Sequence, residues 1–158
     1  MATRVLFVCL GNICRSPAAE AVFAKLVDDA GLAGQFAIDS AGTGAWHVGD
    51  PADSRMRQAA KNRGIAILST ARQVNRDDFE RFDHVVAMDA SNRDTLLHLA
   101  PKTHRHKVVL FRDFDPDARG EDVPDPYYGG AEGFEEVLDI VTRAGLGLLA
   151  ELTKKSGD

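Results

Sequence analysis

A short segment near the N-terminus gathers residue types that could bind an anion and attack it. The segment is Cys9 to Pro17 (CLGNICRSP), and it follows the apolar run of residues 5–8. A cysteine thiolate is a strong nucleophile, and an arginine guanidinium can donate two parallel hydrogen bonds to two oxygens of a tetrahedral oxyanion. The spacing between Cys9 and Arg15 is about the length that closes a loop around one phosphate.

The backbone expected of this segment would form a cradle for that phosphate. Gly11 permits torsions that other residues avoid, and Asn12 tolerates a left-handed conformation. Ser16 is a good N-cap and Pro17 suits the first helical position, so we expect a helix to begin just after Arg15. Inward-facing amides beside a helix N-terminus attract an anion.

The same surroundings favour the ionised thiol of Cys9. Amide dipoles, a helix N-terminus and Arg15 all stabilise a thiolate, so Cys9 is expected to be a nucleophile at neutral pH. The alternative is that Cys9 is a small buried hydrophobic residue, as a lone cysteine at a strand end usually is. Its place before an Arg-Ser-Pro sequence and a helix favours the nucleophile.

Short apolar runs alternate with amphipathic stretches along the whole sequence. Strands are expected at 5–8, 36–40, 85–88 and 108–111, and helices at 17–30, 53–63, 91–99 and 131–154. Strands separated by helices predict an α/β fold, with a parallel four-stranded sheet and helices on both faces. We expect a single domain over residues 1–158, with Gly145 and Gly147 as weak points of the last helix.

Ligands of such sheets bind outside the carboxyl ends of the strands. Cys9 is expected at that end of the first strand, and so are the segment 40–49, Asp89 and the acidic loop 113–130. The fold therefore brings these parts of the sequence to one edge.

The composition argues against binding to nucleic acid and against insertion into a membrane. The chain has 158 residues, is 44% hydrophobic and carries a formal net charge of −5, whereas such surfaces are usually basic. The first apolar stretch is too short for a signal peptide or a membrane span. We therefore expect a cytoplasmic protein, whose cysteines would be catalytic, redox-active or metal-bound. Because both cysteines lie in one loop and the first histidine is His47, no metal site is expected.

The segment from Cys9 to Pro17 resembles the signature of the low-molecular-weight protein tyrosine phosphatases. The resemblance covers nearly the whole chain, because further segments match that family in order and spacing: 39–43, 46–49, 71–73, 88–92 and 125–129. It implies a flavodoxin-like fold of the low-molecular-weight phosphatase type. It also implies a hydrolase without a metal or other cofactor.

The resemblance implies that phosphotyrosine is hydrolysed through a cysteinyl-phosphate on Cys9. Arg15 would bind the phosphate with the loop amides, and Asp125 would protonate the leaving phenolate and then activate water. Asp125 could instead be an ordinary Asp-Pro turn residue. Other acids nearby keep rival assignments open: Asp113, Asp115, Asp117, Glu121 and Asp122. The spacing before Pro126 favours Asp125.

Supporting roles are implied for residues around the loop. The residues expected to bind substrate or phosphate are Leu10, Gly11, Asn12, Ile13, Cys14, Ser16, Trp46, Tyr127 and Tyr128. Ser16 would donate a hydrogen bond to the thiolate, or act only as an N-cap, while Asn12 and Ser40 would brace the loop. Relatives from animals carry a histidine just ahead of the segment 71–73, where this chain has Leu68-Ser69-Thr70.

The implied cleft favours phosphotyrosine as the substrate. Leu10, Trp46, Tyr127 and Tyr128 match positions that wall a slot for a flat aryl ring, although each aromatic residue alone is often only packing. Relatives that hydrolyse phosphoarginine carry a smaller, polar β-branched residue at the position of Ile13. The expected partners are tyrosine-phosphorylated proteins and a cognate tyrosine kinase that could phosphorylate the two tyrosines. The chain is expected to be a monomer or a weak dimer.

Cys14 has two interpretations. It either fills space beside the helix or captures an oxidised Cys9 as a disulfide before overoxidation, and the resemblance favours this redox role.

Rival functions remain open. An arsenate reductase of similar fold would need further cysteines to relay a disulfide, and this chain has only two. A non-catalytic phosphate-binding module would keep Arg15 but would not need Cys9 and Asp125 together. A nucleotide-binding loop is disfavoured, because no Gly-Lys-Ser/Thr ending is present.

Overall fold

The computed structural model describes residues 2–154, and the strands in this range form one parallel sheet. The strands are β1 (Thr3–Cys9), β2 (Phe36–Gly42), β3 (His84–Ala87) and β4 (Val108–Leu110). Their order in the sheet is β2-β1-β3-β4, and every neighbouring pair is parallel. The predicted parallel four-stranded sheet is confirmed.

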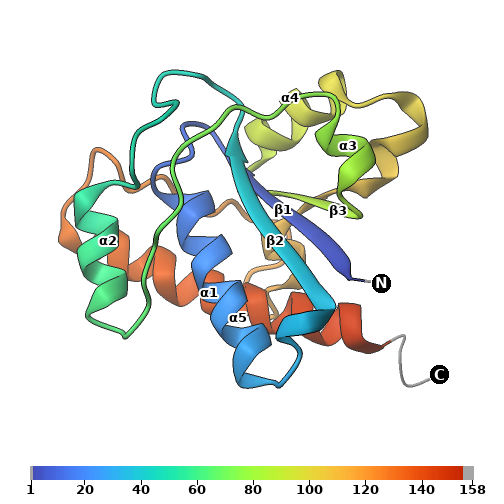
Figure 1. The fold of residues 1–158 in the computed structure, drawn as a ribbon. Coiled ribbons are helices and arrows are strands. Elements are labelled where there is room, and N and C mark those ends of the chain that lie inside the picture. The colour runs from blue at the N-terminus through green and yellow to red at the C-terminus, as the bar shows by residue number, and fades with distance from the viewer. Residues whose placement is uncertain (1, 155–158) are drawn as a thin grey trace.

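The central strand β1 sends alternate side chains to two separate cores, because successive residues of a strand point to opposite faces. Val5 and Phe7 belong to the larger core, and Leu6 and Val8 to the smaller one. The helices α1 (Arg15–Asp29), α2 (Ser54–Lys61) and α5 (Ala131–Lys154) cover the first face. The helices α3 (Asp78–Arg81) and α4 (Ala90–Leu99) cover the second (Figure 1). The α/β fold with helices on both faces is therefore also confirmed.

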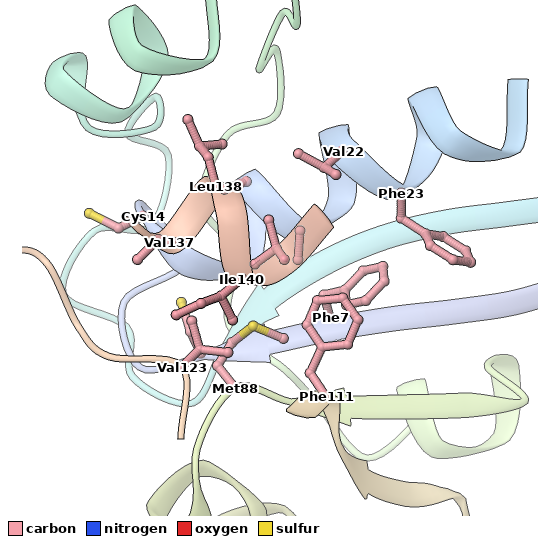
Figure 2. Close-up of a cluster of buried hydrophobic side chains, with 14 of the residues drawn as sticks. Phe7, Cys14, Val22, Phe23, Met88, Phe111, Val123, Val137, Leu138 and Ile140 are labelled. Atoms are coloured by element: carbon pink, nitrogen blue, oxygen red, sulfur yellow. The ribbon is translucent and has the colours of Figure 1, made fainter. Parts of the chain in front are cut away.

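Phe7 lies at the middle of the larger core. Its ring meets Phe23 of α1 edge-on, with 5.5 Å between the ring centroids, and it lies 5.1 Å from the ring of Phe111 (Figure 2). Such pairs contribute about 0.5–1.5 kcal/mol beyond the area that they bury. At the edge of this core, the backbone N–H of Val123 donates to the carbonyl of Met88 at 2.8 Å, which ties the acidic loop to the end of β3.

The last helix, α5, runs without interruption through both of its predicted weak points. An added Cβ at Gly147 would lie 1.9 Å from the carbonyl oxygen of Phe114, the last residue of the 3₁₀-helix η3 (Phe111–Phe114). Glycine is therefore required at position 147 by the close approach of another backbone. Neither α5 nor any other helix within residues 2–154 is long and apolar enough to cross a membrane.

The boundaries of several elements differ from the prediction, and some short elements were missed. The first helix begins at Arg15 instead of Pro17, and β2 continues past Ser40 to Gly42. The missed elements are α3 and the 3₁₀-helices η1 (Ala33–Gln35), η2 (Lys102–Lys107) and η3. Each spans about one or two turns, which is too short to produce a clear hydrophobic period.

We predict that Gly147→Ala destabilises the protein. The backbone clash should outweigh the gain in helix propensity of about 1 kcal/mol and leave a net loss of about 1–3 kcal/mol, as overpacking usually does. Urea unfolding measures this loss. In the control Gly34→Ala, the new Cβ meets nothing within 4 Å, so this variant should unfold like the wild type. Equal stability of the two variants would contradict the close approach seen at α5.

Candidate active site

A pocket of about 370 Å³ opens at the carboxyl end of β1. The predicted site residues that line it are Cys9, Leu10, Gly11, Ile13, Cys14, Arg15, Trp46, Asp125, Tyr127 and Tyr128. His47 lines the pocket as well. The remaining predicted residues, Asn12, Ser16 and Ser40, are buried and bonded to one another close to Cys9. The structure thus brings together residues that are more than 100 positions apart in the sequence.

The phosphate loop, residues 9–15, passes directly into α1 without a side-chain cap. The helix begins at Arg15, and its N-cap position is occupied by Cys14, which makes no capping hydrogen bond. The expectation that Ser16 caps the helix is therefore wrong: Ser16 lies inside the helix, and its hydroxyl is engaged with Cys9 and Asn12. An uncapped helix start leaves the first amides available to an anion.

The sulfur of Cys9 is buried at the floor of the pocket, with 3% of the residue exposed. It lies 3.0 Å from Ser16 Oγ and accepts a hydrogen bond from the backbone N–H of Asn12 at 3.3 Å. Asn12 reaches this position in a left-handed conformation, with φ at 57°. The N–H of Asn12 and the hydroxyl of Ser16 are thus both within hydrogen-bond distance of the sulfur.

The side-chain amide of Asn12 connects the loop to the strand behind it. Its Oδ1 accepts from the backbone N–H of Arg72 at 3.0 Å, and its Nδ2 donates to Ser16 Oγ at 2.8 Å and to Ser40 Oγ at 3.0 Å. A backbone N–H can only donate, so the orientation of this amide is determined. Ser16 Oγ accepts from Asn12, so its single proton is left for one of two acceptors, the carbonyl of Ala41 at 3.4 Å or an ionised Cys9 Sγ at 3.0 Å.

Arg15 is held in the pocket by acids on two sides. Its Nη1 donates to Asp89 Oδ2 at 2.6 Å and to the carbonyl of Val123 at 3.1 Å, and its Nη2 lies 3.6 Å from Asp125 Oδ2. Burial opposes its charge, but Cys9, Asp89 and Asp125 outweigh that effect and hold the pKa of Arg15 above its ordinary value. Arg15 is therefore a fixed cation.

Asp125 stands on an anchored segment of the acidic loop. The Nη1 of Arg112 donates to the carbonyl of Asp122 at 2.9 Å, and Asp122 Oδ1 accepts from the backbone N–H of Ala90 at 2.9 Å. Asp125 itself accepts from the backbone N–H of Tyr127 at 3.1 Å, and 43% of its side chain is exposed. A carboxyl group at this position can reach both solvent and a ligand in the pocket.

Aromatic rings form the rim of the pocket. Trp46 is 73% exposed, yet its ring lies so close to Gly44 that an added Cβ there would be 1.9 Å from it. Tyr127 and Tyr128 meet edge-on with 5.0 Å between their centroids, and the ring of His47 lies 6.3 Å from that of Tyr127. These walls suit a flat ring.

Arg55 links α2 to this tyrosine rim. It pairs with Asp53 at 2.9 Å, donates to the carbonyl of Tyr127 at 3.0 Å, and lies over the rings of Tyr127 and Phe134. The hydrogen bond from Arg55 lowers the pKa of Asp53, which keeps the pair ionised. Asp53 is also the N-cap of α2. The tether formed by Arg55 between Asp53 and the carbonyl of Tyr127 therefore begins at a fixed helix end.

The second cysteine, Cys14, differs from Cys9 in its surroundings. Burial, followed by the nearby carboxylate of Asp53, raises the pKa of Cys14 to about 12. Cys14 is therefore a neutral thiol at physiological pH, although Cys9 and Cys14 both line the same pocket.

Within residues 2–154, no group of three or more His, Cys, Asp or Glu side chains is arranged to hold a metal ion.

Sequence reasoning did not assign a role in the site to His47, Arg55, Arg72 or Asp89. Asp89 was expected at a strand end, and His47 follows the predicted Trp46, so both carried a positional signal. Arg55 and Arg72 act through backbone and ring contacts that only the folded chain reveals.

The fold and the pocket together define a class of α/β proteins that hold a cysteine at the floor of an oxyanion pocket beside a parallel sheet. The sequence model of the family described as "Low molecular weight phosphotyrosine protein phosphatase" matches residues 4–157. The chain belongs to this family, and it is accordingly a cysteine-dependent protein-tyrosine-phosphatase.

Individual relatives agree with this assignment over nearly the full chain. A low molecular weight protein-tyrosine-phosphatase of Streptomyces coelicolor is 50% identical, covering 98% of this chain and 96% of its own. The human low molecular weight phosphotyrosine protein phosphatase is 44% identical, covering 88% and 89%. The crystal structure of a protein tyrosine phosphatase from Entamoeba histolytica, with Hepes in its active site, superposes with a TM-score of 0.95 at 44% identity, covering 98% and 99%.

We predict that Arg55→Ala loosens the tyrosine rim and lowers kcat/KM for a phosphotyrosine peptide about threefold to tenfold, because a charge-assisted hydrogen bond and two cation–π contacts are lost. Steady-state kinetics measure this change. The control Lys61→Ala alters an exposed residue of the same helix and should leave kcat/KM unchanged. The tether would have no role if both variants matched the wild type.

Proposed function

We propose that Cys9 is the nucleophile, Arg15 the phosphate-binding cation and Asp125 the proton donor and acceptor of this phosphatase. The observation that supports this most strongly is the position of Cys9 Sγ between Ser16 Oγ and the N–H of Asn12, in the same pocket as the Arg15–Asp125 pair. Thiolate, cation and carboxylate are the three groups that transfer of a phosphoryl group to sulfur and then to water requires.

In the first step the thiolate of Cys9 attacks phosphorus, and the P–O bond to the phenol breaks. Asp125, in its protonated form, gives its proton to the departing phenolate oxygen, so that a neutral phenol leaves. The loop amides and Arg15 stabilise the charge on the phosphoryl oxygens in the transition state. In the free protein the Asp125 carboxyl lies 3.6 Å from Arg15 Nη2 and lines the pocket that would receive the phosphate.

In the second step water attacks the phosphorus of the cysteinyl-phosphate. The carboxylate of Asp125 takes a proton from this water, the S–P bond breaks, and inorganic phosphate leaves with Cys9 again a thiolate. The hydrogen bond from Ser16 stabilises the departing sulfur. One carboxyl group thus serves as acid and then as base.

The preferred substrates are tyrosine-phosphorylated proteins. The ring of a phosphotyrosine would lie between Trp46 and Tyr127, while its phosphate reaches the loop at the floor. Phosphoserine has a shorter stem and no ring to fill this space. Ile13 lines the pocket with an apolar side chain, which favours an aryl ester over the polar guanidinium of phosphoarginine. Both cysteines are free thiols, which suits a reducing compartment such as the cytoplasm.

Cys14 is assigned a protective role during oxidation. A Cys9 oxidised to the sulfenic acid would condense with the Cys14 thiol, releasing water and forming a disulfide that thiols reduce. The charge of Cys9 is one of the causes of the raised pKa of Cys14. Oxidation of Cys9 removes that smaller contribution, while the larger ones, burial and Asp53, remain.

The first test of the catalytic assignment is the hydrolysis of a phosphotyrosine peptide and of p-nitrophenyl phosphate in the presence of a chelator. Cys9→Ser should abolish turnover. Asp125→Ala should lower kcat about 10²–10⁴-fold for the peptide, the usual contribution of general acid–base catalysis, and less for the nitrophenyl ester, whose leaving group needs less protonation.

Two outcomes would contradict this assignment. Turnover by Cys9→Ser would show that Cys9 is not the nucleophile. An equal loss of kcat on both substrates in Asp125→Ala would show that Asp125 is not the acid that protonates the leaving group. If the wild type bound phosphate without turnover, the fold would serve as a binding module.

The role of Cys14 predicts a difference in recovery after oxidation. Wild-type protein treated with hydrogen peroxide should regain most of its activity with dithiothreitol, whereas Cys14→Ser should regain little, because its Cys9 proceeds to sulfinic acid. Activity before and after reduction measures this, and mass spectrometry of the peroxide-treated wild type should find a Cys9–Cys14 disulfide. Equal recovery of the two proteins would leave Cys14 as packing only.

A further inference from the structure

A carboxyl group that the catalytic scheme does not use lies at the far end of the hydrogen-bond chain from Cys9. Glu20 belongs to α1, and its Oε1 accepts a hydrogen bond from Ser40 Oγ at 2.5 Å. Ser40 Oγ accepts from Asn12 Nδ2, which also donates to Ser16 Oγ, and Ser16 Oγ lies 3.0 Å from Cys9 Sγ. A continuous path therefore joins the carboxyl of Glu20 to the nucleophile.

Counting protons fixes the direction of the bonds that join Asn12, Ser40 and Glu20. Asn12 has two N–H donors on its side chain, and Ser16 and Ser40 receive one each. A hydroxyl carries a single proton, so Ser40 donates its own to Glu20. The proton of Ser16 has two acceptors within reach, the carbonyl of Ala41 at 3.4 Å and Cys9 Sγ at 3.0 Å. An ionised Cys9 can only accept, so in the reactive state Ser16 is the donor of this bond. Glu20 is therefore the terminal acceptor, and the amide of Asn12 is the branch point of the chain.

The carboxyl of Glu20 has hydroxyl groups as its hydrogen-bonding partners. These are Ser40 and Ser69, and Ser69 stands in the segment where the family resemblance leads one to expect a histidine. The guanidinium of Arg72 contributes only weakly, since it forms hydrogen bonds to Asp39 and Asp78. Burial, and to a smaller extent the charge of Asp39, outweigh these stabilising groups and raise the pKa of Glu20.

We propose that Glu20 is a positioning residue whose ionised carboxylate, through Ser40, orients Asn12 and so aims the Ser16 hydroxyl and the Asn12 N–H at Cys9. Loss of this acceptor frees the proton of Ser40 and loosens Asn12, which must keep a left-handed backbone. The inference rests on the proposed role of Cys9 as nucleophile. Acidification through the raised pKa of Glu20 gives its carboxyl a proton that competes to donate to Ser40 Oγ, so the chain makes catalysis sensitive to protonation far from the reacting atoms.

The test compares Glu20→Gln, which keeps an acceptor but cannot ionise, with Glu20→Leu, which has none. For p-nitrophenyl phosphate at pH 7, Glu20→Leu should lower kcat about fivefold with little change in KM, the effect of about one hydrogen bond, while Glu20→Gln should stay within about twofold. Between pH 7 and pH 5, Glu20→Gln should lose a smaller fraction of kcat than the wild type. Asp28→Leu, at an exposed acid on the same helix, should match the wild type.

Alkylation of Cys9 by iodoacetamide, followed by mass spectrometry, gives a second readout that needs no turnover. Glu20→Leu should react about fivefold more slowly than the wild type, because the donors of Ser16 and Asn12 are no longer aimed at the sulfur. A purely structural role would instead speed alkylation by exposing the buried thiol. If Glu20→Leu proves unstable, Ser40→Ala breaks the same link and should give the same pattern.

The inference would be overturned if both Glu20 variants matched the wild type in kcat, in pH profile and in the rate of Cys9 alkylation. The assignment of the nucleophile would then remain intact. Turnover by Cys9→Ser would instead reject the proposed function itself. The two failures are therefore distinguishable.

Discussion

The amide of Asn12 is the contact on which the phosphate loop depends. It joins the loop to β2 through Ser40 and to the segment 71–73 through the backbone of Arg72. These bonds offset the cost of a left-handed conformation, which asparagine tolerates better than most residues other than glycine. Because the same residue donates its backbone N–H to Cys9, the strain and the catalytic geometry are maintained together.

Charge balance around Arg15 gives the pocket its second constraint. A buried guanidinium is stable only when its desolvation is offset by hydrogen bonds and opposite charges, and Asp89 supplies both at 2.6 Å. Asp125 lies farther away, at 3.6 Å, and is partly exposed. Asp89 therefore anchors the cation, while Asp125 keeps the freedom to exchange protons with a ligand.

The sequence predicted most of the architecture and the lining of the pocket, because both rest on strong local signals. The apolar run at 5–8 and the helical period of 131–154 specify β1 and α5 directly, and the Cys9 to Pro17 segment carries its own chemistry. The capping role of Ser16 was wrong because a tertiary contact to Cys9 overrides the local preference of a serine before proline. Contacts such as Arg55 with Tyr127 were not predictable, since they join residues 72 positions apart through a backbone carbonyl.

The most direct test of the whole account is to trap the covalent intermediate. The protein is mixed with a phosphotyrosine peptide, quenched rapidly in acid and digested, and its peptides are analysed by mass spectrometry. The account predicts a single phosphoryl group, attached to the sulfur of Cys9. Turnover without any phosphorylated Cys9, or a phosphoryl group on another residue, would contradict it.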